Sequence, residues 1–440
     1  MDAPWSSKET LETKDRLERL SKEIVDFVHY IEPTKEEQLN RDTLMYQVST
    51  LIETLWPNNT VITAFGSSVT GLAFPASDID INIDFEEMPK KNRIDVLKII
   101  RKQTINQHIF QFPTTCLAAN AKVPVLMAVD DNDVSMDITI QNVCFSSDRT
   151  AAWIKEYPPL KPLFMVLKQA IGNFRLSHMP TFEPLSAKFA GLASYSLICL
   201  IVSYLQQSVP KDVNPTRPNY LASLLLGFLS FYSTFESDKK AIGLTNGGCF
   251  YDKKDCPIPL ETKKGKLTIV DPDVPDVNVA RSTLKFDRIQ YIFKQAYDML
   301  LKQINTSGKS ESILSSLIKV EHHAHTQPRK QGIRFKAGYT WIETGEAQVK
   351  SGGGNKRFGY AKRFGGGKPY VQEDRQRRGD EHRYEEGNRY REEPKSRYQR
   401  AYKAEPYSKR FEDYNDREYQ RHKRNNNTHL AEHYKYKSRR

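Results

Sequence analysis

The stretch that decides the fold reads Phe65-Gly66-Ser67-Ser68-Val69-Thr70-Gly71-Leu72-Ala73-Phe74-Pro75-Ala76-Ser77-Asp78-Ile79-Asp80-Ile81-Asn82-Ile83-Asp84. Its last seven residues alternate between polar side chains and isoleucine, which is typical of a strand with one buried face. Asp78 and Asp80 therefore share the polar face, about 7 Å apart at a rise of about 3.3 Å per residue.

This stretch combines the two parts of a site for phosphoryl chemistry. Gly66 and Ser67 form a turn that can bind phosphate oxygens through backbone N–H groups and a hydroxyl. Carboxylates on one face can bind two divalent ions, which stabilise the attacking and leaving oxygens of an in-line displacement. Asp-x-Asp alone would favour an acidic edge strand in solvent, but the preceding turn favours the metal site.

A third carboxylate is expected on a neighbouring strand. Residues 134–140 alternate again, and Asp137 is the only acid on the polar face of that run. The apolar run 123–129 precedes it, and Pro124 restricts this run to an edge or an irregular position. The acids between the two runs are typical turn residues.

These motifs resemble those of the polymerase-β-like nucleotidyltransferases, and most of all the RNA-surveillance poly(A) polymerases of the TRAMP type, or DNA polymerase sigma family. The resemblance covers about residues 5–318 and rests on Phe-Gly-Ser, Ser-Asp-Ile-Asp, Val-Pro-Val and Asp-Ile-Thr. Downstream segments agree with it, namely 166–169, 191–196 and 271–281.

The resemblance implies an α+β fold with four regions. Residues 1–39 would be a helical lead-in that packs on the central domain, and residues 40–150 a nucleotidyltransferase domain with a mixed sheet. Residues 151–318 would be a helical central domain containing the PAP-associated region. Residues 319–440 lack apolar periodicity and are expected to form a disordered basic tail.

The resemblance also implies a role for each matching position. The metal ligands for two Mg²⁺ or Mn²⁺ ions would be Asp78, Asp80 and Asp137, the last also favouring deprotonation of the RNA 3′-hydroxyl. The residues that bind the substrate ATP would be Gly66, Ser67, Lys168 and Ser194 for its phosphates, Tyr195 and Asn278 for its base, and Arg281 in support of Asn278. Alternatively, Lys168 is a solvated helix residue and Tyr195 a core aromatic.

Some positions depart from the family pattern. Ala190, Ala193 and Ala280 replace a glycine, a serine and a glycine, and no ribose contact is assigned within residues 142–150. Uridylyl-transferring relatives have a histidine where this chain has Val277, which favours ATP over UTP.

The expected activity is template-independent addition of adenylate to RNA 3′ ends. A terminal uridylyltransferase and a catalytically silent RNA-binding scaffold remain as alternatives. By resemblance, the partners would be a zinc-knuckle RNA-binding protein and an RNA helicase, with the exosome acting indirectly, and the location would be nuclear. The sequence shows no signal peptide and no membrane-length apolar run, so a soluble intracellular protein is expected.

The positive charge is concentrated at one end of the chain. Residues 351–440 contain 25 Lys and Arg against 14 Asp and Glu, a net charge of +11 out of +12 for the whole chain. Gly, aromatic and basic residues alternate in this tail, which suits RNA binding through phosphate contacts and base stacking. A solubilising or nuclear-targeting tail is the alternative.

Scattered cysteines and His322, His323 and His325 give no strong indication of a structural metal.

Periodicity and breakers predict the remaining elements. Strands are expected over 61–65, 79–85, 123–129 and 134–140, and helices over 11–31, 34–55, 91–107, 159–174, 187–207, 220–235 and 282–303.

Overall fold

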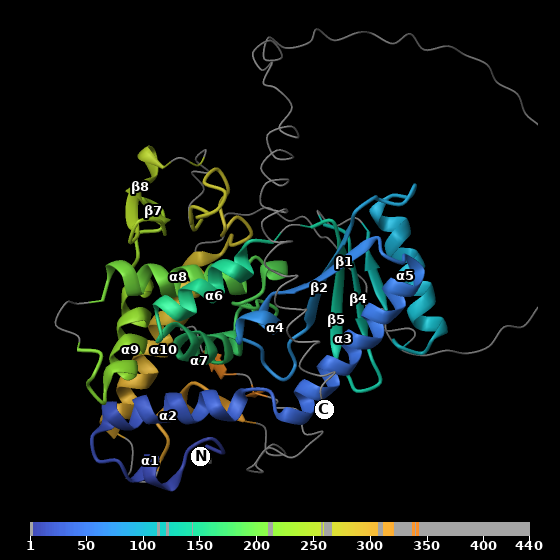
Figure 1. Ribbon diagram of the computed structural model, residues 1–440. Coiled ribbons are helices and arrows are strands. Elements are labelled where there is room, and N and C mark those ends of the chain that lie inside the picture. Colours follow the sequence, from blue (N-terminus) through green and yellow to red (C-terminus); the bar gives the residue numbers. More distant parts are fainter. Residues whose placement is uncertain are drawn as a thin grey trace, which may run out of the picture. The chain divides into compact units, whose positions relative to one another are not determined.

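The computed structural model describes residues 3–111, 115–119, 123–142, 144–209, 214–256, 258, 266–306, 311–320, 337–338 and 340–342. These residues form a mixed five-stranded sheet with helices packed on it and a larger helical region (Figure 1). The predicted α+β class is confirmed. The predicted tail beyond residue 342 lies outside the described residues, as do the three histidines at 322, 323 and 325.

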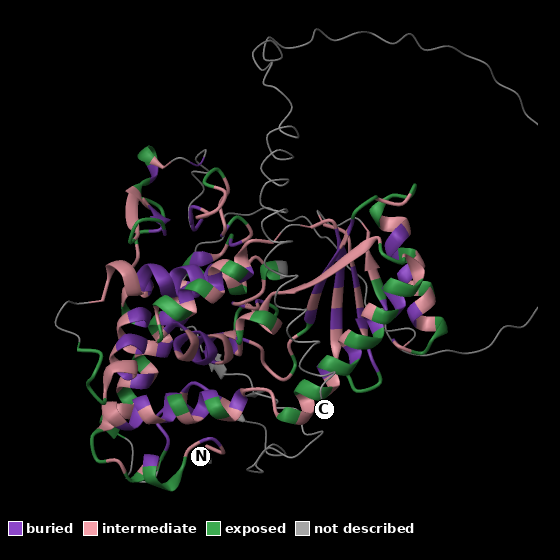
Figure 2. Cartoon of the chain, viewed as in Figure 1, coloured by how far each residue is buried: buried purple, intermediate pink, exposed green. Residues whose placement is uncertain are grey.

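The sheet has the strand order β1 (Thr60–Phe65), β2 (Ile79–Phe85), β5 (Ser135–Ile140), β4 (Val125–Val129) and β3 (Cys116–Ala118). β2 and β5 run parallel, whereas the other three neighbouring pairs run antiparallel. The alternation in the sequence fits this sheet: every isoleucine of β2 is buried (Figure 2).

Two helices cover the apolar face of the sheet. α3 (Lys35–Leu55) and α5 (Arg93–Asn106) share one hydrophobic core with β2, β4 and β5. α3 starts with a capping box, in which Thr34 and Glu37 satisfy each other's backbone N–H groups. Because these helices occupy the isoleucine side, the carboxylates of β2 and β5 face away from this core.

The helical region has its own core, built from α2 (Arg16–Ile31), α7 (Leu160–Gly172), α8 (Ser194–Gln207), α9 (Tyr220–Ser233) and α10 (Phe286–Thr306). α7 and α8 are almost entirely buried along their apolar sides (Figure 2). α2 comes from the N-terminal segment and packs against α7 and α9. The smaller elements are α1 (Lys8–Glu12), α4 (Ser67–Thr70), α6 (Ser146–Glu156), β6 (Phe174–Leu176), β7 (Lys240–Gly243) and β8 (Cys249–Asp252).

The predicted helix over 187–207 is wrong in its first third. A single 3₁₀ turn over Ala187–Phe189 ends at Ala190, whose φ of 63° is left-handed, and α8 begins only at Ser194. A Cβ on Gly191 would collide with the carbonyl oxygens of Glu183 and Pro184. This close backbone approach bends the chain before the helix starts.

Other boundaries also differ from prediction. The helix expected over 11–31 is broken, and Asp15 caps the start of α2. The helix expected over 159–174 ends at Gly172, followed by β6. β4 starts after Pro124 and is an internal strand. Within the stretch assigned to the tail, the short strands are β9 (Lys319–Val320), β10 (Ala337–Gly338) and β11 (Thr340–Ile342), and β11 pairs in parallel with β6.

A buried carboxylate connects α2 to the end of the described helical region. Glu23 has no exposed surface and accepts hydrogen bonds from Ser312 Oγ at 2.6 Å, Ile313 N at 3.0 Å and Leu314 N at 2.8 Å. Burial raises the pKa of Glu23.

We expect Glu23→Ala to lower the free energy of unfolding by about 3 kcal/mol, because each buried donor left without an acceptor costs about 1–3 kcal/mol. Glu18→Ala is the matched control: Glu18 lies on the same helix and forms a surface pair with Lys22 at 2.9 Å, worth less than about 1 kcal/mol. Urea denaturation measures both changes. Equal, small losses for the two variants would contradict a structural role for Glu23.

Candidate active site

The structure brings two of the three predicted carboxylates directly opposite each other. Asp80 of β2 and Asp137 of β5 are register partners in the parallel pair, so their side chains lie on the same face of neighbouring strands. Asp78 lies immediately before β2 and is exposed, whereas Asp80 and Asp137 are half-buried. The three carboxylates thus form a row that runs from the exposed Asp78 to the half-buried Asp80 and Asp137.

The predicted phosphate-binding turn lies against this row. β1 ends at Phe65, which pairs with Asp80, and Gly66 follows with a φ of 71°. A Cβ on Gly66 would overlap the Asp80 carboxylate, so only glycine fits here without displacement. The Gly66 N–H donates to Ser147 Oγ at 2.7 Å. The hydroxyl oxygen of Ser147 therefore occupies the acceptor position that a phosphate oxygen would take at this N–H.

The electrostatics of the row are unfavourable without cations. Burial, and then the neighbouring Asp137 and Asp78 carboxylates, raise the pKa of Asp80 to about 7, and Arg41 opposes this shift. Burial and then Asp78 raise the pKa of Asp137 to about 6. Both groups therefore hold a proton more strongly than an ordinary aspartate does, and a nearby positive charge would lower both pKa values.

The donor set fits hard divalent cations in its chemistry. All three predicted ligands are carboxylates on one face, and Mg²⁺ and Mn²⁺ prefer oxygen donors. Within the described ranges, however, no three His, Cys, Asp or Glu side chains come close enough together to hold one ion.

Lys168 and Ser194, both predicted to bind the triphosphate, lie next to each other. Lys168 Nζ on α7 donates to Ser194 Oγ at 2.7 Å, at the first residue of α8. Burial lowers the pKa of Lys168. No carboxylate in the described part of the chain forms an ion pair with it, so its charge and the positive end of the α8 dipole are available to an anion.

Tyr195 lies in a polar and aromatic cluster. Its ring stacks on Trp153 of α6 at a centroid distance of 6.3 Å and an interplanar angle of 20°. Its buried hydroxyl has no hydrogen-bond partner among the residues that the structure describes. Burial raises the pKa of this hydroxyl. One ring face is thus covered by Trp153, which holds Tyr195 in place.

The side chain of Asn278 holds its own loop. Its Oδ1 accepts from Ile269 N at 3.0 Å and Ala280 N at 2.9 Å, and its Nδ2 donates to Leu267 O at 3.1 Å. These bonds leave one amide N–H for a base. Arg281 is exposed, and its backbone N–H donates to Asn278 O at 3.2 Å.

Sequence reasoning missed the residues of α6. Ser147 contacts the turn, Arg149 forms a short ion pair with Asp273 in the loop before Asn278, and Trp153 supports Tyr195. Their spacing along one eleven-residue helix, directly after the Asp137 strand, was the available signal.

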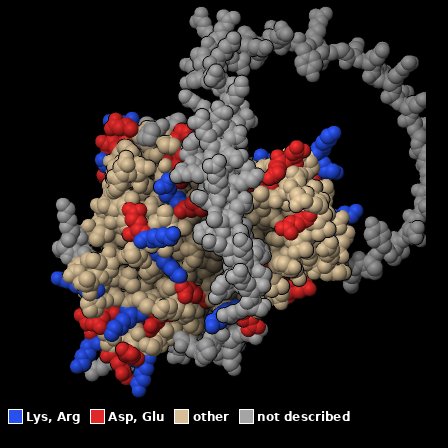
Figure 3. All heavy atoms as spheres, viewed as in Figure 1, with Lys and Arg blue, Asp and Glu red and all other residues tan. Residues whose placement is uncertain are grey.

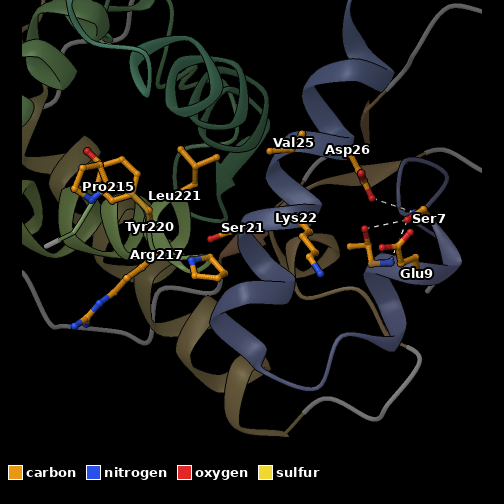
Figure 4. Close-up of a pocket in the computed structure, with 12 residues that line it drawn as sticks. Ser7, Glu9, Ser21, Lys22, Val25, Asp26, Pro215, Arg217, Tyr220 and Leu221 are labelled. Carbon is orange, nitrogen blue, oxygen red and sulfur yellow. Dashed lines mark hydrogen bonds between the residues drawn. The ribbon is translucent and has the colours of Figure 1, made fainter.

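A pocket of about 460 Å³ lies elsewhere, between the N-terminal helices α1 and α2 and the segment before α9 (Figure 4). Ser7, whose N–H donates to Asp26 at 3.1 Å, lines one side, and Pro215 and Tyr220 line the other. None of the predicted site residues lines this pocket.

Known proteins share both regions. Residues 20–145 match the family model "Poly(A) RNA polymerase, mitochondrial-like, central palm domain", and residues 220–276 match "Cid1 family poly A polymerase". The chain is 25% identical over 334 residues to Poly(A) RNA polymerase protein 1 of Saccharomyces cerevisiae, covering 72% of this chain and 50% of that protein. It is 29% identical over 315 residues to Poly(A) RNA polymerase gld-4 of Caenorhabditis elegans, covering 68% and 35%.

Both regions of the chain are thus similar to those of poly(A) RNA polymerases. The chain spans about half the length of these relatives or less. The fold agrees: a solved structure described as the polymerase core of TRAMP, an RNA surveillance complex, has a TM-score of 0.63 and 23% identity, covering 72% of this chain and 99% of that one. A Cid1 poly(U) polymerase structure has a TM-score of 0.52 and 19% identity, covering 66% and 95%. A Drosophila melanogaster relative, 26% identical over 68% of this chain and 73% of its own length, is named as an inactive poly(A) RNA polymerase.

The raised carboxyl pKa values predict a pH-dependent stability for the metal-free protein. A carboxyl whose folded pKa lies above its ordinary value of 3.8 favours the folded state most at low pH. This contribution is lost as the pH rises through about 6 for Asp137 and about 7 for Asp80.

We therefore expect the melting temperature in EDTA to fall less between pH 5 and 8 for Asp80→Asn than for the unchanged protein. Asp131→Asn, in an exposed turn, is the control and should follow the unchanged protein. Thermal denaturation across this pH range measures the difference. Parallel curves for all three proteins would show that these carboxylates are not coupled to folding.

Proposed function

We propose that this chain is a template-independent RNA 3′-end adenylyltransferase that uses ATP and two divalent ions. The observation that carries the proposal is the pairing of Asp80 with Asp137 beside the turn at Gly66, in a chain similar to poly(A) RNA polymerases. The reaction joins the RNA 3′-oxygen to the α-phosphorus of ATP, breaks the α–β phosphoanhydride bond and releases pyrophosphate. The 3′-hydroxyl loses its proton as the new bond forms.

In this proposal, Asp78, Asp80 and Asp137 hold the ions. When bound, the ions stabilise charge on the attacking and leaving oxygens. Asp137 faces the nucleophile side and favours loss of the 3′-hydroxyl proton. Catalysis is then mainly positioning and electrostatic stabilisation.

The remaining residues of the proposal hold ATP. Gly66 and Ser67 bind the outer phosphates, which requires the Ser147 hydroxyl to leave the Gly66 N–H or to share it. Lys168 and Ser194 bind the triphosphate from the helical region. Tyr195 stacks on the base, and Asn278 keeps the base-contacting loop folded.

Two observations bear on the choice of nucleotide. Val277 cannot hydrogen-bond to a base, in contrast to the histidine of uridylyl-transferring relatives. The fold similarity to a Cid1 poly(U) polymerase keeps a terminal uridylyltransferase as the second candidate. A silent RNA-binding scaffold is disfavoured because all three carboxylates are present.

Domain limits, partners and location are part of the proposal. We assign residues 1–39 to the lead-in, 40–150 to the catalytic domain and 151–318 to the central domain, followed by the basic tail. RNA 3′ ends are the substrate, and a zinc-knuckle protein, a helicase and a nuclear location follow from the resemblance to TRAMP-type enzymes. No helix in the described segments is both long and apolar enough to cross a bilayer.

The basic tail is proposed to supply RNA affinity that the rest of the chain lacks. Residues 1–350 carry 41 Lys and Arg against 40 Asp and Glu. On the visible face of the described residues, the two signs of charge are interspersed (Figure 3). The net charge of residues 1–350 is therefore too small to attract RNA strongly.

The catalytic proposal predicts that purified protein extends an unstructured RNA with ATP in preference to UTP, CTP or GTP. Asp80→Asn should lower the rate on the order of a thousandfold or more, because a ligand for the ions is lost. Asp84→Asn is the matched control, since Asp84 lies on the same face of the same strand and receives a hydrogen bond from Asn82 at 2.9 Å. Gel analysis of extended RNA gives both results. Equal or greater use of UTP would replace the adenylyl assignment with the uridylyl one.

Deletions test the tail. Removing residues 351–370 takes away a net charge of +5, and removing 371–440 takes away +6. If the Gly-aromatic-basic pattern of 351–370 binds RNA, the first deletion should weaken RNA binding more than the second. It should also reduce the slope of log binding constant against log salt concentration by an amount equivalent to several ions. Fluorescence anisotropy at 50–200 mM salt measures the RNA-binding constant of each deletion variant. An unchanged slope in both deletions would refute RNA binding by the tail.

A further inference from the structure

Arg41 is a buried cation whose hydrogen bonds reach the candidate site from α3. It lies on α3, on the helix side that also carries the core residues Leu44 and Val48, and only 4% of its surface is exposed. A buried guanidinium is costly unless its N–H groups are satisfied. Among the described residues, no carboxylate lies within ion-pair distance of it, so its position requires another explanation.

The guanidinium joins two chain segments that are separate in sequence. It donates to Ser68 Oγ at 2.9 Å in α4, and to the carbonyl oxygens of Ser77 at 2.5 Å and Asp78 at 3.2 Å. Ser68 Oγ also donates to Asp78 O at 3.4 Å. One segment carries the phosphate-binding turn and the other leads into the strand of the carboxylates.

The geometry of these contacts suits Arg better than Lys. A guanidinium presents five N–H donors in a rigid plane, so it can fix several oxygens relative to each other, whereas an ammonium is a mobile point charge. The charge of Arg41 also attracts Asp78 and Asp80. Arg41 therefore acts on the candidate site in two ways. Its hydrogen bonds hold the backbone carbonyl groups of Ser77 and Asp78, and its positive charge attracts the Asp78 and Asp80 carboxylates.

We propose that Arg41 is a positioning residue, whose guanidinium fixes the turn at Gly66–Thr70 to the start of β2 so that the carboxylates and the turn bind metal and triphosphate together. The inference rests on the proposed function. It adds a residue that touches neither substrate nor reacting atoms and acts through Ser68 and Asp78. A purely structural Arg41 would stabilise the fold without affecting the site.

Arg41→Lys and Ser68→Ala test this role in the full chain. Ser68→Ala removes one partner of the guanidinium and leaves no new buried charge. Arg19→Lys is the matched control: Arg19 is 2% exposed, lies on α2 and donates to the carbonyl oxygens of Thr13 at 3.1 Å and Glu311 at 3.3 Å. The first readout is Mn²⁺ affinity without nucleotide, measured by electron paramagnetic resonance. The second is amide hydrogen exchange of residues 66–80.

We expect Arg41→Lys to weaken Mn²⁺ binding about 10–100-fold, as loss of a residue that orients metal ligands typically does. Exchange at 66–80 should increase, and KM for ATP should rise with the same trend. Ser68→Ala should show smaller changes of the same sign, and Arg19→Lys should show none of them.

Unchanged Mn²⁺ affinity and exchange in folded Arg41→Lys and Ser68→Ala proteins would overturn the proposal. If Arg41→Lys does not fold, Ser68→Ala decides alone. The two readouts need no catalysis, so a protein that extends no RNA would count against the proposed function while leaving the role of Arg41 open to the same measurement.

Discussion

The parallel pairing of β2 with β5 is the constraint on which the candidate site depends. It places Asp80 beside Asp137 at half-buried positions, where each carboxylate raises the cost of ionising its neighbour. A fold gains nothing in stability from such a row, because like charges in a region of low dielectric repel strongly. Its presence in the centre of a well-packed sheet supports the proposal that the row binds cations.

The surroundings of the row follow from that constraint. Gly66 has a φ of 71°, which favours glycine, and a side chain there would also displace the Asp80 carboxylate. The absence of a side chain at Gly66 lets the turn lie against the Asp80 carboxylate, so the proposed phosphate and metal sites are neighbours. Arg41 then supplies a fixed positive charge from the core side, where no mobile ion can enter.

The residue pattern within a single strand or helix was sufficient to predict some features of the structure. The period of two in β2 and β5 placed Asp80 and Asp137 on one face, and the capping box placed the start of α3. The late start of α8 could not be predicted, since it results from Gly191 packing on the carbonyl of Pro184. The engagement of Asn278 with the backbone at Leu267 likewise appears only once the loop is folded. Long-range contacts decide both features, and a sequence window does not contain them.

The connection between the two regions runs through α6. Ser147 near its start holds the turn, Arg149 pairs with Asp273 in the loop before Asn278, and Trp153, one turn further, holds Tyr195. A rigid helix transmits a displacement at one end to the other, because its backbone hydrogen bonds resist local change. Phosphate binding that displaces Ser147 from the Gly66 N–H would therefore also shift Tyr195 and the loop that contains Asp273. In the proposed function, α6 therefore connects the turn that would bind the phosphates with the residues that would contact the base.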